Sequence, residues 1–490
     1  MKRSGIKNPD NNKLILFLLI LIYGAVTFST MINHEPWRDE AQAWLLARDL
    51  GAGELIRQLP MEGTPGLWHF LLFLLNQAGF SYQSQFILHW LLGFTAVVIF
   101  FLKAPFSLIF KVIFCFSYYL FFEYIIIARN YNLTVLMLII IASLYHLRQR
   151  KPILIASLIF LLFNTNIHSF GIALSLSLIM GYELTRKKID LSGIAAFVLI
   201  FLGFACLMLQ IYPISPDQQN ALVASNSAGF HLEPLLRAAQ DAFLPGTQAD
   251  SLVGFFFFII FILFLLRMLN KVALFLLLLI SIGWLYLIFA AIHEGSARQH
   301  GLIIIIMVFT LWLERYYPGQ KDQADFCQII KIFTFSDVSL HILKITLLVS
   351  CLSGIYHHYQ EHNFLYSGGR EAAGWISENL ASDAVIIAYP SYAATSLLPY
   401  LPDHRFWYAD REEYGTYMIW DKKFADNGYK LSYQDIIERS ESHFDREERY
   451  YLLNKAIPAF EKSYQRLFRN STTIFAQKDE DFYIYRAKEF

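Results

Sequence analysis

Charged side chains are scarce in this sequence. They make up 16% of its 490 residues, whereas a soluble domain averages roughly 25%. The 40 Lys and Arg residues equal the 40 Asp and Glu residues, so no excess of positive charge points to a nucleic-acid partner. Cysteine is rare as well. The four cysteines show no C-x-x-C spacing, which argues against a disulfide-stapled secreted fold and provides no metal-binding motif.

What is present is apolar sequence, unevenly distributed. Hydrophobic residues make up 56% of the chain. Residues 1–356 hold 24 Lys and Arg against 19 Asp and Glu, a net charge of +5. Residues 357–490 hold 16 against 21, a net charge of −5, at a density of charge that is ordinary for a soluble domain. This split predicts a membrane domain over 1–356 and a water-exposed domain over 357–490.

Eleven apolar runs in the first part approach the roughly 20 residues that a helix needs to cross the hydrocarbon core. The first run follows several basic residues, as in a signal peptide, but it is long and lacks a clear cleavage site, which favours an uncleaved anchor. The predicted spans are 14–32, 85–102, 105–122, 131–147, 152–167, 169–184, 192–212, 252–269, 272–291, 299–314 and 335–356.

Residues 66–79 form a shorter apolar run that suits a re-entrant or interfacial helix. The positive-inside rule supports this prediction. If the run does not cross and the N-terminus is cytoplasmic, the inner connections collect Lys103 and the basic residues of 148–151, 186–188, 267–271 and 315–331. The sequence therefore predicts a multi-pass protein of the plasma (inner) membrane whose C-terminal domain is extracytoplasmic.

The first outer loop, residues 33–84, opens with His-Glu-Pro-Trp-Arg-Asp-Glu. Trp37 and Trp44 are seven residues apart, which predicts a helix on the outer membrane interface with both indoles at the headgroup level. On such a helix Glu35 and Asp39 are neighbours, with Glu40 beside them. Two interpretations remain open: a functional site, or an acidic first turn that complements the helix dipole.

Other ionisable residues also fall on the predicted outer side. Glu123 and Arg129 flank one connection, His168 lies in another, and the sequence HEGSARQH brings Arg298 and His300 into a third. Each of these residues alone is usually a solvated group at a span end. The long segment 213–250, with His231, Glu233 and Asp241 among its polar residues, is either a lid or acceptor site or a cover without chemistry.

Together these groups suggest a chemistry. A carboxylate can act as a general base on an acceptor hydroxyl, and arginines can hold a phosphate leaving group. Apolar walls can hold a lipid tail. A lipid-phosphate-activated donor, used at the outer membrane surface, meets all three conditions.

These residues resemble a known family. WRDEAQAW at 37–44 and EGTPGLWHFLL at 62–72 are similar to the first outer loop of the GT-C superfamily of membrane glycosyltransferases, in particular the family 39-type protein mannosyltransferases and aminoarabinose transferases. Arg129 with Tyr131, His168 in IHSFG and Arg298 in ARQHGL resemble further motifs of that family. Where relatives often have His-Pro, this chain has Thr64-Pro65.

The resemblance implies an inverting transferase that uses a polyprenyl-phosphate sugar as donor and a cell-envelope glycan, lipid or protein as acceptor. Catalysis would fall to Asp39 as the base, supported by Glu40. The acceptor would be positioned by Glu35 and Arg38. The donor phosphate would be bound by Arg129, Tyr131, His168, Arg298 and His300. The resemblance makes no cofactor certain, and some enzymes of the superfamily need a divalent metal, which Glu35 and Asp39 could ligate.

The acidic part predicts a small α/β domain. Expected helices cover 368–380, 391–401, 433–442 and 445–468, and expected strands cover 384–389 and 404–410, with 473–477 and 482–487 as a closing pair. Nothing in this part resembles a nucleotide-binding loop.

Two other classes of function are open to such a chain. A secondary transporter would favour internal repeats and polar groups at mid-membrane. The sequence shows no convincing repeat, and the predicted span centres carry almost no charge. A non-catalytic scaffold or flippase partner with a sensory outer domain is the other alternative, against which the acidic first loop weighs mildly.

Overall fold

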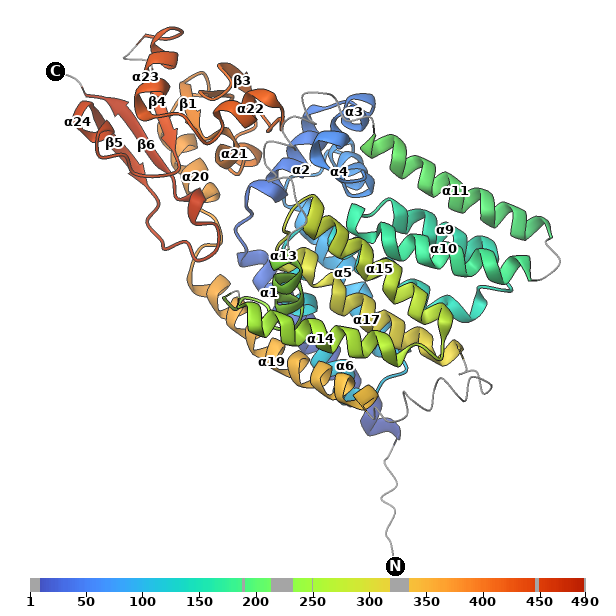
Figure 1. Cartoon of the computed structure of the whole chain (residues 1–490). Helices are drawn as coiled ribbons and strands as arrows, with labels where there is room; N and C mark the ends of the chain where they lie inside the picture. The colour runs from blue at the N-terminus through green and yellow to red at the C-terminus, as the bar shows by residue number, and fades with distance from the viewer. Residues whose placement is uncertain are drawn as a thin grey trace, which may run out of the picture.

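The computed structural model describes residues 9–186, 190–212, 232–248, 250–317, 335–445 and 449–488. The chain folds into a helical domain and a smaller domain built on one six-stranded sheet (Figure 1). In the helical domain the first outer loop contributes α2 (Arg38–Asp49), α3 (Ala52–Glu62) and α4 (Leu67–Gln77). Its other helices are α1 (Pro9–Asn33), α5 (Ser84–Lys103), α6 (Leu108–Cys115), η1 (Tyr119–Glu123), α7 (Tyr124–Ile126), α8 (Tyr131–Leu144), η2 (Tyr145–Leu147), α9 (Pro152–Phe163), η3 (Ile167–Ser169), α10 (Phe170–Thr185), α11 (Leu191–Ile211), α13 (Glu233–Phe243), α14 (Ser251–Arg267), α15 (Val272–Ala291), α16 (Ala297–His300), α17 (Leu302–Leu313), η4 (Glu314–Tyr316) and α19 (Phe335–Asn363).

Seven helical segments among the described residues are long and apolar enough to cross a membrane. They are Lys13–Asn33, Ser84–Lys103, Ile167–Thr185, Leu191–Ile211, Val272–Ala291, Ala297–Tyr316 and Val338–Asn363. An eighth is formed if α6 is joined to Tyr119–Ile126 across a bend of 57°. The three remaining predicted spans coincide with the shorter apolar helices Tyr131–Leu147, Pro152–Phe163 and Ser251–Arg267. Every predicted span is thus an apolar helix, and the count of eleven crossings stays a prediction.

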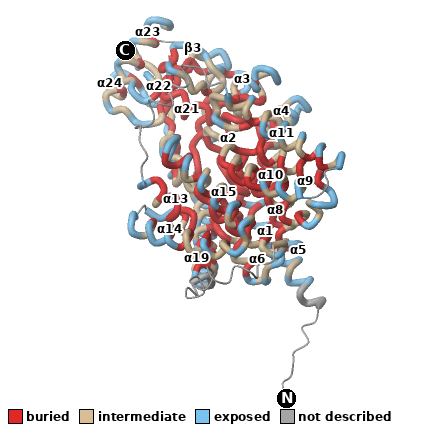
Figure 2. The backbone as a smooth tube through the Cα atoms, turned by 45° about the vertical axis from the view of Figure 1, so that its right-hand side comes forward, coloured by how far each residue is buried: buried red, intermediate tan, exposed pale blue. Residues whose placement is uncertain are grey.

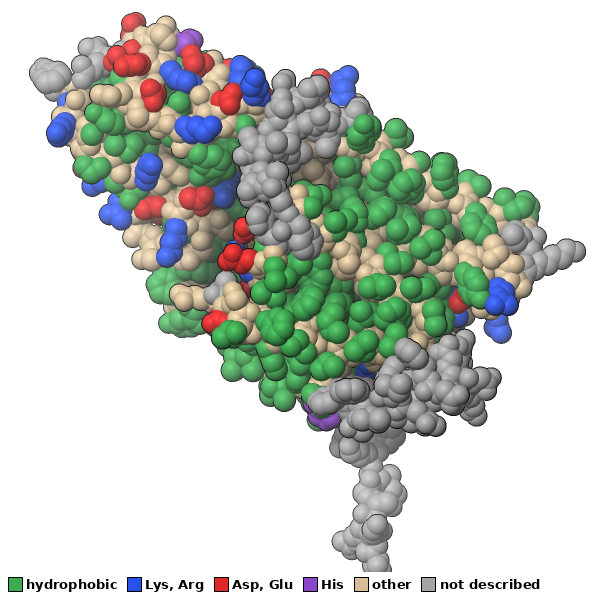
Figure 3. All heavy atoms as spheres, in the orientation of Figure 1, with side chains coloured by type: hydrophobic (Ala, Val, Ile, Leu, Met, Phe, Trp, Pro, Cys, Tyr) green, Lys and Arg blue, Asp and Glu red, His purple; other side chains and the backbone are tan. Residues whose placement is uncertain are grey.

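The outer surface of these helices is apolar. Leu209 on α11 is 73% exposed and Phe201 is 66% exposed, although both side chains are strongly hydrophobic. Figure 3 shows hydrophobic side chains covering the helical domain, whereas Lys, Arg, Asp and Glu gather on the sheet domain. The buried backbone runs through the centre of the helical domain in Figure 2. An apolar exterior of this extent is what a lipid-facing protein presents.

The helical domain has two distinct ends. At one, α1 and α19 finish side by side: the Thr30 hydroxyl lies 2.6 Å from His358 Nδ1, and Asn33 Nδ2 lies 3.2 Å from His362 Nδ1. We call this the Asp39 end, because the first outer loop and the sheet domain lie there (Figure 1). Both ends of α4 are also here. The Leu67 N–H donates to the Asn164 carbonyl at 3.3 Å, and Tyr82 packs on Tyr400 of the sheet domain. The chain thus enters and leaves α4 at the same end of the helical domain, as it must if residues 66–79 do not cross the membrane.

The opposite end, which we call the Arg148 end, holds local ion pairs. Arg148 Nε lies 2.8 Å from the Glu183 carboxylate. Glu314 lies between Arg267, at 2.9 Å, and Lys271, at 2.8 Å. The basic members of these pairs, Arg148, Arg267 and Lys271, are residues that the positive-inside rule predicts on one side of the membrane. The predicted inner residues of 187–188 and 318–331 lie outside the described residues.

The C-terminal domain carries a sheet with the strand order β3-β2-β1-β4-β6-β5. Strand β1 (Val385–Tyr389) pairs in parallel with β2 (Phe406–Tyr408) and with β4 (Arg449–Leu453). The outer pairings are antiparallel and involve β3 (Glu413–Gly415), β5 (Tyr464–Arg469) and β6 (Tyr483–Ala487). The helices of this domain are α20 (Gly369–Asn379), α21 (Ser391–Ala394), η5 (Leu398–Tyr400), α22 (Lys422–Asn427), α23 (Tyr433–Glu441), α24 (Phe460–Ser463) and η7 (Lys478–Glu480).

Alternate residues of the central strands face two separate cores. Ile387 and Tyr451 pack on one face with Ile436 of α23. Ile386 and Leu452 pack on the other face with α20 and α21, and this second core also includes Ala41 and Leu45 of α2. The sheet domain is therefore completed by a helix from the first outer loop.

Part of the predicted C-terminal structure is wrong. Residues 445–468 do not form a helix, since β4, α24 and the start of β5 occupy this stretch. Strand β4 is buried on both faces, and a short continuous apolar run of this kind has no alternation that would distinguish it from a helix. The predicted 473–477 strand is limited to a single bridge between Ile474 and Leu365, while β6 pairs with β4 and β5.

The predicted interfacial helix is displaced as well. Helix α2 begins at Arg38, so Glu35 lies before the helix and is not a neighbour of Asp39 on its surface. Trp37 and Trp44 are only 5% and 3% exposed, which excludes both indoles from a headgroup layer. Helix α2 lies between the two domains because both of its faces are apolar enough to be covered. In addition, α19 runs seven residues past the predicted domain boundary, to Asn363.

Candidate functional site

Asp39 lies in a cluster of charges at the Asp39 end of the helical domain. One of its carboxylate oxygens is 2.7 Å from Arg129 Nη1 and 3.6 Å from Arg298 Nη1. Arg298 Nε is in turn 3.5 Å from Glu123. The side chains of Asp39 and Arg129 are each 28% exposed, so the centre of the cluster can be reached from outside. The structure thus brings together three residues that are far apart in the sequence and were predicted as base and phosphate ligands.

Helix breaks position these side chains. The chain bends by 57° between α6 and Tyr119–Ile126, and Glu123 is the last residue of the π-helical turn η1 that follows the bend. The Glu123 carboxylate accepts the Tyr118 hydroxyl at 2.6 Å. Arg129 lies in the interruption between α7 and α8. Arg298 lies on the one-turn helix α16, and its carbonyl accepts the Tyr124 hydroxyl at 2.7 Å. Directly after α16, a Cβ on Gly301 would lie 2.2 Å from the Tyr119 ring, so the close approach requires glycine.

Glu40 occupies a different position from its neighbour Asp39. It is fully buried, and its carboxylate accepts hydrogen bonds from the backbone N–H groups of Trp37 and Ala128 and contacts His34 Nε2 at 3.0 Å. Ala128 immediately precedes Arg129. Glu40 therefore holds the backbone next to Arg129, and its full burial separates it from the accessible centre of the cluster.

His34 connects Glu40 to the end of α19. Its second ring nitrogen lies 3.0 Å from Glu361. Burial alone would lower the pKa of His34, but the carboxylates of Glu361 and Glu40 outweigh it and raise the pKa to about 10. A buried imidazolium thus lies between two buried carboxylates. This triad joins the first outer loop to α19, the helix that leads into the sheet domain.

Glu35 and Arg38 contact the sheet domain instead of the Asp39 cluster. Glu35 accepts the backbone N–H groups of Arg370, at 2.7 Å, and Glu371, at 3.3 Å, in the first turn of α20. Burial raises the pKa of Glu35 to about 7, despite the nearby Arg370. Arg38 lies 2.7 Å from Asp479 and 3.2 Å from Glu480. Both predicted acceptor-positioning residues are thus part of the contact between the domains.

A chain of polar side chains leads from the first outer loop to His168. The Asn130 amide donates to the Thr64 hydroxyl at 2.6 Å, and Asn166 donates to Asn130 at 2.8 Å. His168 Nδ1 lies 2.7 Å from Asn166, while its Nε2 is buried without a partner among the described residues. Tyr131 packs against the His168 ring with centroids 5.9 Å apart. The predicted phosphate ligands Tyr131 and His168 are therefore held next to Arg129 by the asparagines.

His300 is held by residues that do not belong to the Asp39 cluster. Its Nδ1 lies 2.9 Å from Asp241 on α13, and its Nε2 lies 2.9 Å from the Glu294 carbonyl. Both ring nitrogens are engaged and the residue is fully buried, so His300 has no free nitrogen for a donor phosphate. The predicted loop 213–250 is helical over α13, and its residues 213–231 lie outside the described residues.

Glu62 is a carboxylate that the sequence did not single out. It ends α3, accepts Gln42 Nε2 at 3.0 Å and interacts electrostatically with Arg129 and Asp39. Burial raises the pKa of Glu62 to about 7, against the opposing effects of Gln42 and Arg129. Its position in the quoted EGTPG motif was visible in the sequence, but nothing there placed it close to Asp39.

Metal ligation finds little support in these positions. No group of three His, Cys, Asp or Glu side chains within the described ranges could hold a metal ion. Glu35 and Asp39, the pair considered for this role, face different partners.

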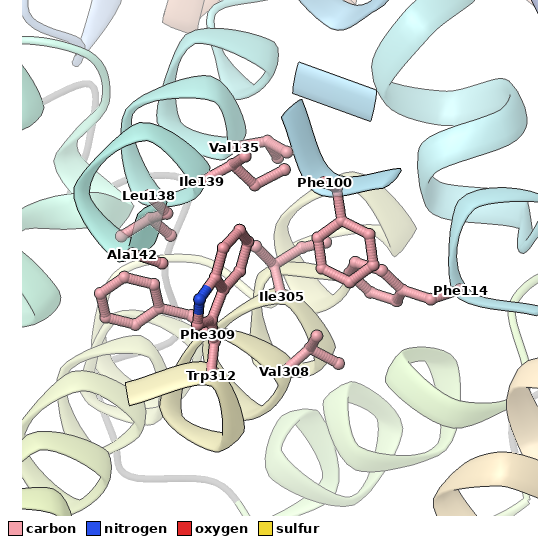
Figure 4. A pocket seen from close by; sticks show the side chains of 10 residues that line it. All are labelled: Phe100, Phe114, Val135, Leu138, Ile139, Ala142, Ile305, Val308, Phe309 and Trp312. Carbon is pink, nitrogen blue, oxygen red and sulfur yellow. The ribbon is translucent and has the colours of Figure 1, made fainter. Parts of the chain in front are cut away.

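Figure 4 shows an apolar cavity inside the helical domain, and none of the residues that line it belongs to the charged cluster. Its volume is about 10 Å³, barely room for one water molecule. It is lined by apolar side chains of α5, α6, α8 and α17, among them Phe100, Phe114, Leu138 and Trp312. It is a packing gap and too small for a lipid tail.

No protein-family model matches the chain, and no curated protein matches it either. The geometry of the site and the resemblance of its short motifs are therefore what points to a function.

Proposed function

We propose that the protein is an inverting glycosyltransferase that moves a sugar from a polyprenyl-phosphate donor to a cell-envelope acceptor at the outer face of the plasma membrane. The observation that carries the proposal is the Asp39 carboxylate held by two arginines from separate helix breaks, next to an apolar helical surface. The protein would be an enzyme of the GT-C superfamily with its N-terminus cytoplasmic and its sheet domain outside.

Each group has a defined task in the proposed reaction. Arg129 and Arg298 bind the donor phosphate, whose oxygens replace Asp39 as partner of the guanidinium groups. The released Asp39 carboxylate accepts the proton of the acceptor hydroxyl. The acceptor oxygen then bonds to the anomeric carbon as the carbon–phosphate oxygen bond breaks. The leaving polyprenyl phosphate takes the electron pair, and the arginines stabilise its charge.

The apolar exterior of the helical domain supplies the site for the lipid part of the donor. Exposed side chains such as Leu209 on α11 face the proposed hydrocarbon layer. The Gly66 N–H donates to Gln210, one residue further along α11, at 2.7 Å, so this helix reaches the first outer loop. A lipid lying along the bundle would thus have its phosphate at the depth of the charged cluster.

The test is transfer by the purified full chain in liposomes that are supplied with synthetic polyprenyl-phosphate hexose, pentose and amino-sugar donors and with a cell-envelope extract as the source of acceptor. Asp39→Asn is expected to lower transfer by about 10²- to 10⁴-fold, the usual contribution of a general base. Asp49→Asn, in the last turn of the same helix, is the matched control and should retain activity. Transfer by Asp39→Asn at the wild-type rate would remove Asp39 from the mechanism.

The natural donor and acceptor can be identified by comparing cell-envelope glycans with and without the protein by mass. A missing hexose, pentose or amino sugar would name the transferred group. An unchanged envelope together with inactivity on all three donor classes would contradict the proposal.

A further inference from the structure

The carboxyl edge of the C-terminal sheet points toward the Asp39 cluster. Strand β1 lies between β2 and β4 and is parallel to both. After β1 the chain continues outward to β2 and β3 and then returns to the other side of β1 as β4, so the strand order reverses between β1 and β4. In open α/β sheets, ligands bind outside the carboxyl ends of the strands at such a switch point.

Residues at the carboxyl edge of the sheet contact one another and Arg38. Asn454, directly after β4, donates to the Asp479 carbonyl at 3.0 Å. The Asp479 carboxylate lies 2.7 Å from Arg38, and the Arg38 guanidinium lies 4.8 Å from the ring centre of Tyr392, which follows β1. Arg38 precedes Asp39 in the chain. The switch point of the sheet and the charged cluster therefore meet at the first turn of α2.

Tyr429 is an exposed tyrosine close to the place where the sheet edge meets the first turn of α2. Tyr429 is 67% exposed, and its ring packs on Tyr392 at 5.2 Å and on Phe424 at 5.2 Å. It interacts electrostatically with Arg38, Asp479 and Asp39. The Tyr392 ring is tilted by 41° and the Phe424 ring by 67° to the Tyr429 ring, so neither stacks face to face on it, and most of the Tyr429 side chain stays exposed.

We infer that the acceptor is a carbohydrate and that it binds at the Tyr429 platform, formed by Tyr429, Tyr392, Arg38 and Asp479. A sugar ring places its C–H face on an aromatic ring and its hydroxyls against a guanidinium and a carboxylate. A lipid chain would cover the Arg38–Asp479 ion pair, whose side chains are 20% and 39% exposed, without offering hydrogen bonds in place of the water it displaces. The inference rests on the proposed function, because it places the acceptor on the side of Asp39 that faces the sheet domain.

Binding can be measured without turnover. The full-length protein in lipid nanodiscs, carrying Asp39→Asn, is mixed with linear hexasaccharides of glucose, mannose or N-acetylglucosamine, and binding is followed by saturation-transfer NMR. At least one hexasaccharide should bind. Tyr429→Ala should weaken its affinity about tenfold, equivalent to about 1.4 kcal/mol, and Tyr429→Trp should retain it.

Tyr414→Ala is the matched control, since Tyr414 is also an exposed tyrosine of the sheet domain but lies on edge strand β3, where it contacts Phe444. The affinity of the Tyr414→Ala variant for the hexasaccharide should stay within about twofold of that of the Asp39→Asn parent. The inference is overturned if no hexasaccharide binds, if Tyr429→Ala binds as the parent does, or if a Ser/Thr hexapeptide binds in its place in a Tyr429-dependent way. Failure of the proposed function is a separate result, in which Asp39→Asn still transfers sugar while the platform still binds it.

Discussion

The two ends of the helical domain contain similar ion pairs in very different settings. At the Arg148 end, Arg148 and Glu183 pair at 2.8 Å, and Glu314 is shared by two basic residues. At the Asp39 end, Arg129 and Asp39 pair at 2.7 Å, but behind them lies a fully buried triad of Glu40, His34 and Glu361. The ion pair itself does not mark a functional site. What distinguishes the Asp39 end is a buried framework that fixes the pair from several elements.

The largest difference between the ends should appear in stability. Glu40→Gln removes one of two carboxylates beside a buried imidazolium, and the expected loss in the free energy of unfolding is about 3–5 kcal/mol. Glu183→Gln, at the Arg148 end, should cost about 1 kcal/mol or less. Unfolding in mixed micelles, followed by tryptophan fluorescence, measures both. Equal losses would break the comparison.

Activity should differ almost as strongly. Arg129→Ala removes one donor to the proposed leaving phosphate, and transfer should fall about 10²- to 10³-fold. Arg148→Ala removes an arginine from an ion pair of nearly the same length and should leave transfer within about twofold of wild type. The liposome assay with the active donor compares them. A similar loss in both variants would mean that Arg129 acts only through folding.

The contact between the first outer loop and the sheet domain should depend on pH. Burial raises the pKa of Glu35 to about 7 and that of Glu480 to about 8, the latter against Arg38. A raised folded-state pKa means that the native protein binds more protons than the unfolded chain between the ordinary carboxyl pKa and these values. Stability should therefore fall as pH rises from 5 toward 8, on the order of 1 kcal/mol per pH unit for each group.

Thermal unfolding of the full chain between pH 5.5 and 8.5 tests this dependence. Glu480→Gln should flatten it, while the exposed Glu378→Gln should leave the slope unchanged. A melting temperature that rises with pH over this range would show the opposite sign and refute the assignment.

The smallest effect is expected at Lys271. Glu314 keeps Arg267 at 2.9 Å when Lys271→Met removes the other cation, so the loss of stability should stay below about 1 kcal/mol. Transfer should be unchanged. A loss of activity here would give the Arg148 end a role in function and would weaken the contrast between the ends.

The sequence predicted the apolar helices well, because each is a long run with few charges. It also grouped Asp39, Arg129 and Arg298 on one side of the membrane, and the structure brings these three together. Asp39 and Glu40 were predicted for the same task, and the structure places them in different surroundings. Adjacent helical residues point about 100° apart, so one faces the open cluster and the other faces the protein interior.

Other features could not be predicted from local patterns. His34 and Glu361 are 327 positions apart, and no periodicity connects them. Arg38 was expected to serve the acceptor from within the membrane domain, but its partners Asp479 and Glu480 belong to a domain that seemed independent by composition. Strand β4 was mistaken for a helix because it is buried on both faces.

Helix α2 also sets an order of events during synthesis. Its residue Arg38 precedes its partner Asp479 by 441 positions, which corresponds to roughly 20–90 s of translation at about 5–20 residues per second. Throughout that interval Ala41 and Leu45 lack the core that buries them in the finished protein. The contact of the first outer loop with the sheet domain can therefore be completed only after residue 479 has been made.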